Sequence, residues 1–344
     1  MSDQPQFDSI LLVSFGGPEG PGEVLPFLEN VLRGKNVPRE RMLEVVEHYQ
    51  QFGGVSPINA QNRALIAALR TELDAAGINL PIYWGNRNWN PMLTDTLREM
   101  RTDNRQRAIA FFTSMFSCYS GCRQYRENIQ VAQEEVGEGA PLVEKVRKGF
   151  NHPLFIEAQA ELVLKGLEQI DAPKRAAAKL LFTAHSIPMS MADNSNYVKQ
   201  LTEAAKLVAT AVGSENWELV FQSRSGPPQQ PWLEPDVCDR IDELAFSGTT
   251  DVVIIPLGFV SDHMEVLFDL DTEAKDICEK HSIGMVRIPA VGTHPSFVRM
   301  IRELIQERLE SRSTRATVGD LPASHDVCPV DCCLYPQTHR PQSQ

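Results

Sequence analysis

The stretch Val252-Val253-Ile254-Ile255-Pro256-Leu257-Gly258-Phe259-Val260, followed at once by Ser261-Asp262-His263-Met264-Glu265, decides the fold class. A short apolar run bounded by glycine and proline is typical of a strand that is buried on both faces, as strands of parallel sheets are. A second apolar run, residues 180–183, ends in Ala184-His185-Ser186. Ligands of open α/β sheets bind at the carboxyl ends of the strands, so a histidine and a carboxylate are expected at one rim.

Short β-rich runs alternate with longer helical patterns along most of the chain. The β-rich runs are residues 10–14, 82–84, 108–112, 180–183, 218–222, 252–257 and 285–289, and the helical patterns include 62–76, 153–169 and 297–310. This alternation is typical of βαβ units. It predicts an α/β protein of two similar Rossmann-like half-domains, residues 1–150 and 151–313, with parallel sheets flanked by helices and a cleft between them. Residues 314–344 are expected to form a cysteine-containing tail without a core of its own.

Composition narrows the class of protein further. The 344 residues are 42% hydrophobic and 23% charged, which is typical of a soluble globular protein. A net charge of −12 without a lysine or arginine block argues against a nucleic-acid partner and favours cations. The first residues lack a basic and apolar signal, and no apolar run approaches the roughly 20 residues that span a bilayer. We therefore expect a cytoplasmic protein without a transmembrane segment.

Glu265 has two interpretations. With Asp262 it forms the spacing of a capping box, in which Glu265 only closes the start of a helix. With Asp269 and Glu273 it forms a row at i, i+4 and i+8, where like charges oppose a helix and would instead offer oxygen ligands to a divalent cation or a path to protons. His185 can accept a proton near neutral pH or coordinate a metal, although an isolated histidine is more often structural.

Hydroxyl and aromatic side chains point to a flat, anionic and largely apolar ligand. Tyr49 and Ser56 flank the segment 52–55, and Tyr125 lies between Arg123 and Arg126. Hydroxyls and guanidinium groups bind carboxylates, while aromatic rings pack against a planar ligand.

The tail carries the most specific metal signal. Seven cysteines in a chain without a secretion signal are more typical of thiols or metal ligands than of disulfides. Cys328, Cys332 and Cys333 lie within six residues, and a bound metal would supply the folding energy that the tail lacks. A fourth ligand must come from elsewhere, with Cys122 the best candidate and Cys118 the second. Four thiolates suit a [2Fe-2S] cluster or zinc, and their spacing does not choose between the two.

Several motifs occur in an order that resembles one family. They are Leu-Val-Ser-Phe-Gly-Gly-Pro at 12–18, Gly-Gly-Val-Ser-Pro at 53–57, Thr-Ala-His-Ser-Ile-Pro at 183–188, Phe-Gln-Ser-Arg at 221–224, Pro-Trp-Leu at 231–233 and Gly-Phe-Val-Ser-Asp-His-Met-Glu-Val-Leu at 258–267. From about residue 8 to 312 the chain resembles the ferrochelatases. The resemblance implies two Rossmann-like domains sharing a cleft, and insertion of Fe²⁺ into a porphyrin that is held and bent there, with two protons released.

The resemblance also implies roles for individual residues. His185 would lie near the centre of the macrocycle with Glu265 as its opposing carboxylate, and both would contact Fe²⁺. His263 would lie beside Glu265, and Asp269 and Glu273 would continue an acidic track. The substrate-binding positions would be Phe15, His48, Tyr49, Ser56 and Tyr125.

Within the family, the Ser-Gly-Cys segment at 120–122 and the cysteine-rich tail resemble the actinobacterial branch. That branch implies a [2Fe-2S] cluster, here on Cys122, Cys328, Cys332 and Cys333, and coproporphyrin III as the substrate, metallated before its decarboxylation to haem. Implied partners are coproporphyrin III, Fe²⁺, an iron donor and a coprohaem-decarboxylating enzyme.

Two residues depart from the family pattern. Phe15 replaces a tyrosine that can ligate product iron in several relatives, so coordination of the product must differ here. His48 stands where some relatives have arginine, which weakens that contact to a substrate propionate.

Three alternatives remain open. The chain can act on protoporphyrin IX and give haem directly. A related chelatase for cobalt or another metal would use the same fold, although the cysteine tail argues against it. A non-catalytic haem or iron–sulfur redox sensor would bind porphyrin without consuming Fe²⁺, so turnover separates this alternative from an enzyme.

Overall fold

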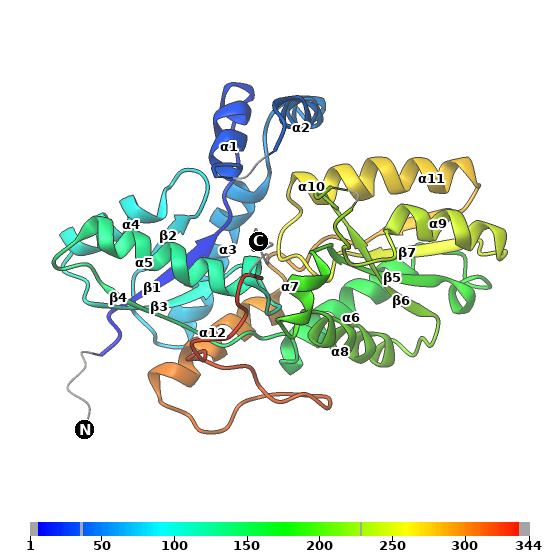
Figure 1. The fold of residues 1–344 in the computed structure, drawn as a ribbon. Coiled ribbons are helices and arrows are strands. Elements are labelled where there is room, and N and C mark those ends of the chain that lie inside the picture. The colour runs from blue at the N-terminus through cyan, green and yellow to red at the C-terminus, as the bar shows by residue number, and fades with distance from the viewer. Residues whose placement is uncertain (1–5, 35–36, 228, 337–344) are drawn as a thin grey trace, which may run out of the picture.

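The computed structural model describes residues 6–34, 37–227 and 229–336. It contains two four-stranded parallel sheets, one from each half of the chain (Figure 1). The first sheet has the strand order β2-β1-β3-β4 and the second has the order β6-β5-β7-β8, so the same topology occurs twice. This repetition confirms the two similar α/β halves that the grouping of the apolar runs predicted.

Seven strands coincide with the predicted apolar runs. The strands are β1 (Ser9–Ser14), β2 (Ile82–Asn86), β3 (Arg107–Phe112), β4 (Leu142–Lys145), β5 (Lys179–His185), β6 (Trp217–Gln222), β7 (Asp251–Ile255) and β8 (Gly284–Arg287). The pattern did not predict β4, which pairs only with β3 at the edge of its sheet. Its first residue, Leu142, is 49% exposed, so this short strand lacks the apolar run of a buried one.

The three predicted helical stretches lie in α3, α6 and α12. The α-helices are α1 (Val24–Val31), α2 (Arg39–Gln51), α3 (Ile58–Ala75), α4 (Leu93–Thr102), α5 (Gln124–Val136), α6 (Pro153–Leu167), α7 (Met189–Asp193), α8 (Tyr197–Ala211), α9 (Val237–Phe246), α10 (Met264–Phe268), α11 (Lys275–Lys280) and α12 (Pro295–Leu309). Two 3₁₀ turns, η1 (Pro21–Glu23) and η3 (Arg175–Ala177), and two π-helical turns, η2 (Tyr119–Arg123) and η4 (Asp269–Ala274), complete the elements.

Each sheet is covered on both faces, and its central strands, such as β1 and β7, are buried at every position. In β1, Ile10 and Leu12 pack toward α3 and α12, while Leu11 and Val13 pack toward α4 and α5. The second sheet has α6 and α8 on one face and α9 to α11 on the other. One continuous core joins the two sheets, since α12 returns to the first, where the rings of Phe297 and Phe111 meet edge to face.

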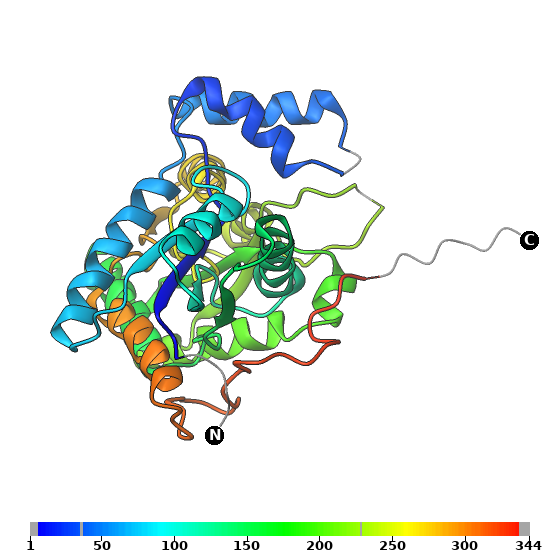
Figure 2. The ribbon, with the colours of Figure 1, turned by 90° about the vertical axis from the view of Figure 1, so that its left-hand side faces the viewer.

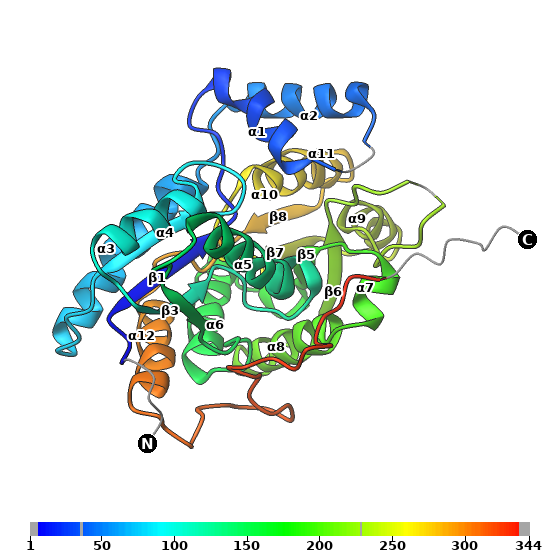
Figure 3. The same cartoon turned by 60° about the vertical axis from the view of Figure 1, so that its left-hand side comes forward.

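Helices α1 and α2 form a pair that stands above the two sheets (Figures 2 and 3). The apolar stripe that begins with Val24, Phe27 and Leu28 is buried in a small separate core with Tyr49. Met264 of α10, from the other half of the chain, belongs to the same core. The pair is therefore attached to the second half at the point where α10 begins.

The tail runs along the molecule without a helix or strand in its described part, residues 310–336 (Figure 3). It is ordered by hydrogen bonds to the segment after β4. Val318 N donates to Asn151 O at 2.9 Å, and Asn151 Nδ2 donates to Leu321 O at 2.7 Å. Across the described ranges, no helix combines the length and the apolar character needed to cross a membrane.

Candidate active site

His185 and Glu265 come together where strand β5 ends and helix α10 begins. His185 Nε2 lies 3.6 Å from Glu265 Oε2, and the two side chains are 33% and 52% exposed. Strands β5 and β7 are neighbours in one parallel sheet. His185 ends β5 and Glu265 follows the loop after β7, so both side chains lie at the carboxyl edge of the sheet, as the two apolar runs predicted. The pair is thus accessible from outside the protein.

The backbone around His185 fixes which ring nitrogen faces Glu265. His185 Nδ1 lies 2.5 Å from the carbonyl oxygen of Ser186, which can only accept, so Nδ1 carries the proton. In the neutral ring Nε2 then keeps its lone pair. Tyr197 Oη donates to the carbonyl oxygen of His185 at 3.0 Å and holds the end of the strand. Nε2 is thereby presented as a proton acceptor or a metal ligand.

Glu265 does not close a capping box. Helix α10 begins after His263 without a side-chain cap, because the carboxylate of Asp262 is engaged elsewhere. Asp262 accepts from Arg287 Nη1 at 2.7 Å and from Ala290 N at 3.1 Å. The capping interpretation is therefore wrong in this structure, and the carboxylate of Glu265 is left facing His185.

The acidic row does not follow a regular α-helix as the spacing predicted. A π-helical turn, η4, separates α10 from α11, and it begins at Asp269 and contains Glu273. Such turns insert one extra residue into a helix and are frequent at functional sites. Asp269 accepts from Ser223 Oγ and from Gln222 Nε2, the latter at 3.1 Å. Two polar groups after β6 therefore hold the middle of the row.

Burial and like charge raise the proton affinity of this row. Burial, together with the negative charges of Glu265 and Glu273, raises the pKa of Asp269 to about 7. Partial burial and Asp236 raise the pKa of Glu273. His263 lies near both members of the pair, and burial and then His185 lower its pKa. Asp269 can thus exchange a proton near neutral pH.

The predicted substrate-binding residues of the first half lie near this pair or beside the α1–α2 core. Tyr49 is 8% exposed, and burial and the charge of Glu265 raise its pKa, which places it within electrostatic reach of the pair. The ring of His48 stacks on Phe268, the last residue of α10, with centroids 3.8 Å apart. Phe15 meets Phe27 edge to face at 6.3 Å.

Ser56 and Tyr125 are more buried than a direct ligand contact would favour. Ser56 is 3% exposed and lies against Gly17, where a Cβ atom would come within 2.7 Å of the Ser56 Cβ. Tyr125 is 4% exposed and stacks on Phe112 at 5.1 Å. Arg87 covers Tyr125, with its guanidinium carbon 4.6 Å from the ring centroid.

Sequence reasoning assigned no role to several residues around the site. They are Arg87, Tyr197, Gln222, Ser223, Lys145 and Lys148. A signal existed for Gln222 and Ser223, because they follow β6 just as His185 ends β5. No signal identified Arg87, whose importance depends on contacts from three separate elements.

The predicted thiols converge on the turn η2. The thiols of Cys122, Cys328, Cys332 and Cys333 line one cavity, and Cys332 Sγ lies 3.6 Å from Cys333 Sγ. Hydrogen bonding with Cys328 and the neighbouring ammonium groups lower the pKa of the Cys122 thiol. Cys118, the second candidate for the fourth ligand, accepts a hydrogen bond at its Sγ from the backbone N of Gly121 at 3.2 Å.

Two buried lysines face these thiols. Lys145 and Lys148 are 6% and 4% exposed, and neither forms an ion pair with a carboxylate in the described part of the chain. Lys148 Nζ donates to the carbonyl oxygens of Ser114 and Gly121, each at 2.7 Å, and burial lowers its pKa. Both lysines line a cavity of about 620 Å³ together with the four thiols. Buried cations without a carboxylate partner favour an anion in that cavity.

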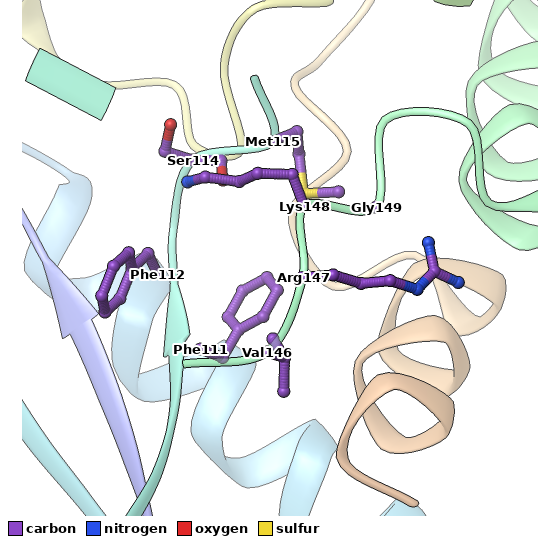
Figure 4. A pocket seen from close by; sticks show the side chains of 8 residues that line it. All are labelled: Phe111, Phe112, Ser114, Met115, Val146, Arg147, Lys148 and Gly149. Carbon is purple, nitrogen blue, oxygen red and sulfur yellow. The ribbon is translucent and has the colours of Figure 1, made fainter. Parts of the chain in front are cut away.

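The segment after β4 sends alternate side chains to the thiols and to α12. Figure 4 shows Lys148 extending toward Ser114, while Arg147 extends the other way toward α12, where it pairs with Glu307 at 2.8 Å. The space between them is a cavity of about 10 Å³, enough for one water at most. Among the described residues, no three His, Cys, Asp or Glu side chains are arranged as a ready metal site. The thiols are therefore gathered but not preformed around a metal, and the cluster stays a prediction.

Two halves of identical topology, with functional groups at the sheet rims, define the chelatase type of two-domain α/β protein. The solved structure of SirB from Bacillus subtilis with Fe³⁺ shares this fold, at a TM-score of 0.53 and 15% identity over 88% of this chain and 97% of that one. The sirohydrochlorin chelatase SirB from Bacillus subtilis subspecies spizizenii in complex with cobalt is similar, at a TM-score of 0.51 and 11% identity over 90% and 98% of the two chains.

The family itself follows from the sequence comparison. Residues 8–309 match the family model described as Ferrochelatase, and the chain belongs to the ferrochelatase family of enzymes. A ferrochelatase of Rhodopirellula baltica is 66% identical over 97% of this chain and 95% of its own length. A coproporphyrin III ferrochelatase of Streptomyces coelicolor is 49% identical over 96% and 94% of the two chains.

Proposed function

We propose that this enzyme inserts Fe²⁺ into coproporphyrin III, giving Fe-coproporphyrin and two protons. The observation that carries the proposal is the pair at the rim, His185 Nε2 and Glu265 Oε2, 3.6 Å apart in a family whose members metallate porphyrins. If a flat macrocycle lay between two side chains, each would contact one face at about 3.5 Å, so the two side chains would be roughly 7 Å apart. In the observed arrangement, His185 and Glu265 would therefore act from one face of the porphyrin.

The chemistry needs a proton acceptor and an oxygen and nitrogen ligand set. Two pyrrole N–H protons must leave while a hydrated Fe²⁺ sheds water. Nε2 of His185 can take a proton or bind iron, and the Glu265 carboxylate can bind iron or stabilise the imidazolium. Asp269, whose pKa is about 7, can pass protons or iron between this pair and Glu273.

Coproporphyrin is favoured over protoporphyrin by the relatives. Several proteins named coproporphyrin III ferrochelatase, from Streptomyces, Nocardia and other genera, are 45–49% identical to this chain. We also propose, from the family resemblance of the sequence, that the product passes to a coprohaem-decarboxylating enzyme and that an iron donor supplies the metal. The cytoplasmic location is proposed because all seven cysteines are free thiols.

We also propose that Cys122, Cys328, Cys332 and Cys333 hold a [2Fe-2S] cluster. The residues fit this group, because four thiols and two uncompensated ammonium groups line one cavity, and a cluster with four thiolates is an anion. When bound, the cluster would supply an electron-accepting centre and crosslink the tail to η2. Zinc would use the same thiolates, and its complex would be colourless.

An anaerobic assay with Fe²⁺ tests the function. Loss of free-porphyrin fluorescence is followed for coproporphyrin III and protoporphyrin IX, and kcat/KM is compared, with His185→Ala as the matched blank. Preferential consumption of coproporphyrin supports the proposal. Preference for protoporphyrin would keep the enzyme class but contradict the proposed substrate. Binding of both porphyrins without turnover of either would favour the sensor.

A further inference from the structure

Arg87 lies between the proposed porphyrin site and the thiol site. It follows β2, and its backbone N donates to Ser14 O at 3.0 Å, which fixes it beside the end of β1. The next residue, Asn88, donates its backbone N to Phe15 O at 3.1 Å. These two bonds hold the Arg87 backbone in one place, so its side chain departs from a rigid base.

The guanidinium packs against an aromatic wall, defined as the rings of Tyr125, Phe15, Phe27 and Tyr49. Its carbon lies 4.6 Å from the ring centroid of Tyr125 and 5.8 Å from that of Phe15. From Phe15 the wall continues through Phe27 to Tyr49, with centroid distances of 6.3 and 6.0 Å. The negative charge of Glu265 contributes, after burial, to the raised pKa of Tyr49. The cation therefore packs against the wall that leads to the catalytic pair.

The guanidinium also contacts the cysteine-bearing turn η2 and α5, the helix that carries Tyr125. Arg87 Nη1 donates to Ser120 O in η2 at 3.5 Å, and Arg87 Nε donates to Asn128 Oδ1 in α5 at 2.6 Å. Ser120 belongs to the π-helical turn that carries Cys122. A π-helical turn differs from an α-helical one by a single inserted residue. A change from one form to the other would therefore move Ser120 and Cys122 together relative to Arg87.

The same turn holds the tail from the opposite direction. Arg123 Nη1 donates to Val330 O at 2.6 Å and to Cys332 O at 3.2 Å. The ring of Tyr119 meets that of Tyr335 edge to face at 4.8 Å. A displacement of the tail that follows loss of its thiol coordination would therefore remove these contacts from the turn η2.

No carboxylate among the described residues pairs with Arg87, and burial lowers its pKa. Two acceptor oxygens and two aromatic rings contact the half-buried guanidinium. A shift of Ser120 or Asn128 would consequently move the guanidinium against Phe15 and Tyr125.

We propose that Arg87 is a positioning residue that couples the thiol site to the porphyrin site. Coordination of a metal by the four thiols would fix the position of η2, and η2 would fix the guanidinium of Arg87 through Ser120. Arg87 would in turn keep the rings of Phe15 and Tyr125 in their porphyrin-binding positions. This inference rests on the proposed function. By linkage, a porphyrin in the wall also stabilises the thiol site by the same factor.

The test is a double-mutant cycle on the affinity for metal-free coproporphyrin III, measured by fluorescence quenching. The four proteins are the wild type, Arg87→Ala, Cys332→Ser and the double variant. We expect each single variant to bind about tenfold more weakly and the double variant to bind no more weakly than either, because both changes break one chain of contacts. Multiplying effects in the double variant would overturn the proposal, since they would indicate a direct and independent contact of Arg87 with the porphyrin.

Three further proteins sharpen the cycle. Arg63 also stacks over a ring, that of Trp84 at 5.5 Å, but its hydrogen bonds go to Glu19, so Arg63→Ala should combine with Cys332→Ser multiplicatively. Arg87→Lys keeps the charge without the forked donors and should restore only part of the affinity. Asn128→Ala removes an acceptor while Arg87 stays, and should weaken binding in the same non-additive way even if Arg87→Ala fails to fold.

A second readout concerns the thiols alone. In the protein as purified, coproporphyrin III should slow the loss of the thiol-bound metal to a chelator in the wild type, and this protection should disappear in Arg87→Ala. Equal protection in both proteins would contradict the coupling. Failure of the wild type to bind coproporphyrin at all would instead overturn the proposed function, so the two failures are distinguishable.

Discussion

Nε2 of His185 lies 3.6 Å from Oε2 of Glu265, and the Nδ1 proton of the same ring is fixed by the carbonyl oxygen of Ser186. A strand end and a short helix thereby present one lone pair and one carboxylate to the same point. Neither side chain is buried, so both can meet a substrate that approaches the rim. The pair consists of only two side chains, but the tautomer and the orientation of the His185 ring are fixed before any substrate binds.

His185→Ala should abolish metallation while porphyrin still binds. The variant removes the lone pair that can accept a pyrrole proton or bind iron, and loss of such a group lowers turnover by on the order of 10²–10⁴-fold. The porphyrin itself is expected to be held mainly by other groups. Anaerobic turnover and quenching of coproporphyrin fluorescence measure the two properties separately.

The matched control for this variant is His281→Ala, because His281 pairs with Asp242 on α9, in an ion pair apart from the rim. It should keep full turnover. Substantial metallation by His185→Ala would remove His185 from the assigned role, whatever its effect on binding.

Asp269→Asn should stabilise the metal-free protein above pH 7. The pKa of Asp269 is raised to about 7, so between pH 4 and 7 the folded protein keeps a proton that the unfolded chain has lost. The fold therefore loses stability as the pH rises through this range, and the full cost remains above pH 7. The asparagine side chain does not ionise, so the variant avoids this loss of about 1–4 kcal/mol in the free energy of unfolding. Its amide oxygen can still accept hydrogen bonds from Ser223 and Gln222.

The gain should shrink as the pH falls from 7 to 4, and thermal unfolding in chelator at several pH values measures it. Asp276→Asn removes a carboxylate from the exposed part of α11 and serves as the control. A gain in Asp269→Asn that is independent of pH would show that the carboxyl of Asp269 is not the titrating group.

Most of the fold could be predicted because apolar runs in parallel sheets are continuous. Strands buried on both faces, such as β1 and β7, leave no ambiguity in the pattern. The edge strand β4 could not be found, since its exposed Leu142 and its charged residues resemble a loop. The π-helical turn η4 was also invisible, because the spacing of Glu265, Asp269 and Glu273 fits an α-helix equally well.

The site was predictable where it depends on strand ends and unpredictable where it depends on packing. His185 and Glu265 follow apolar runs, so position alone pointed to them. The competing role of Glu265 in a capping box failed because Arg287, from strand β8, takes the carboxylate of Asp262. Such a contact between distant parts of the chain leaves no local signal, and the same is true of Arg87 and of Lys148 beside the thiols.

Cys332→Ser should bleach the visible spectrum of the purified protein and lower its melting temperature. The substitution removes one of four proposed ligands, and the tail has no core to compensate for the lost crosslink. Visible absorption and thermal unfolding report the two effects. Cys238→Ser, in α9, should leave the spectrum unchanged. An unchanged spectrum and melting temperature in Cys332→Ser would refute the ligand assignment, and a colourless zinc-containing wild type would refute the cluster.

Glu307→Gln should destabilise the protein strongly, because it leaves Arg147 buried without its counter-charge. The Arg147 side chain is 0% exposed, and its Nε and Nη2 lie 2.8 and 3.0 Å from the two carboxylate oxygens of Glu307, which is 4% exposed. Arg147 also donates to Ala316 O, so the pair joins α12 to the start of the tail. Removing one partner of a buried ion pair costs about 3–5 kcal/mol, since the remaining charge stays desolvated.

Urea unfolding measures this cost through the midpoint at constant slope. Glu310→Gln is the matched control, because Glu310 pairs with Arg312 at the surface, where both side chains are nearly half exposed. That change should cost less than about 1 kcal/mol. If both variants lost the same small amount, the charge of Glu307 would not be what anchors Arg147, and the tail would have to be held by its backbone hydrogen bonds alone. A large loss confined to Glu307→Gln would instead identify the buried pair as the fixed point from which the segment 145–151 presents Lys148 to the thiols.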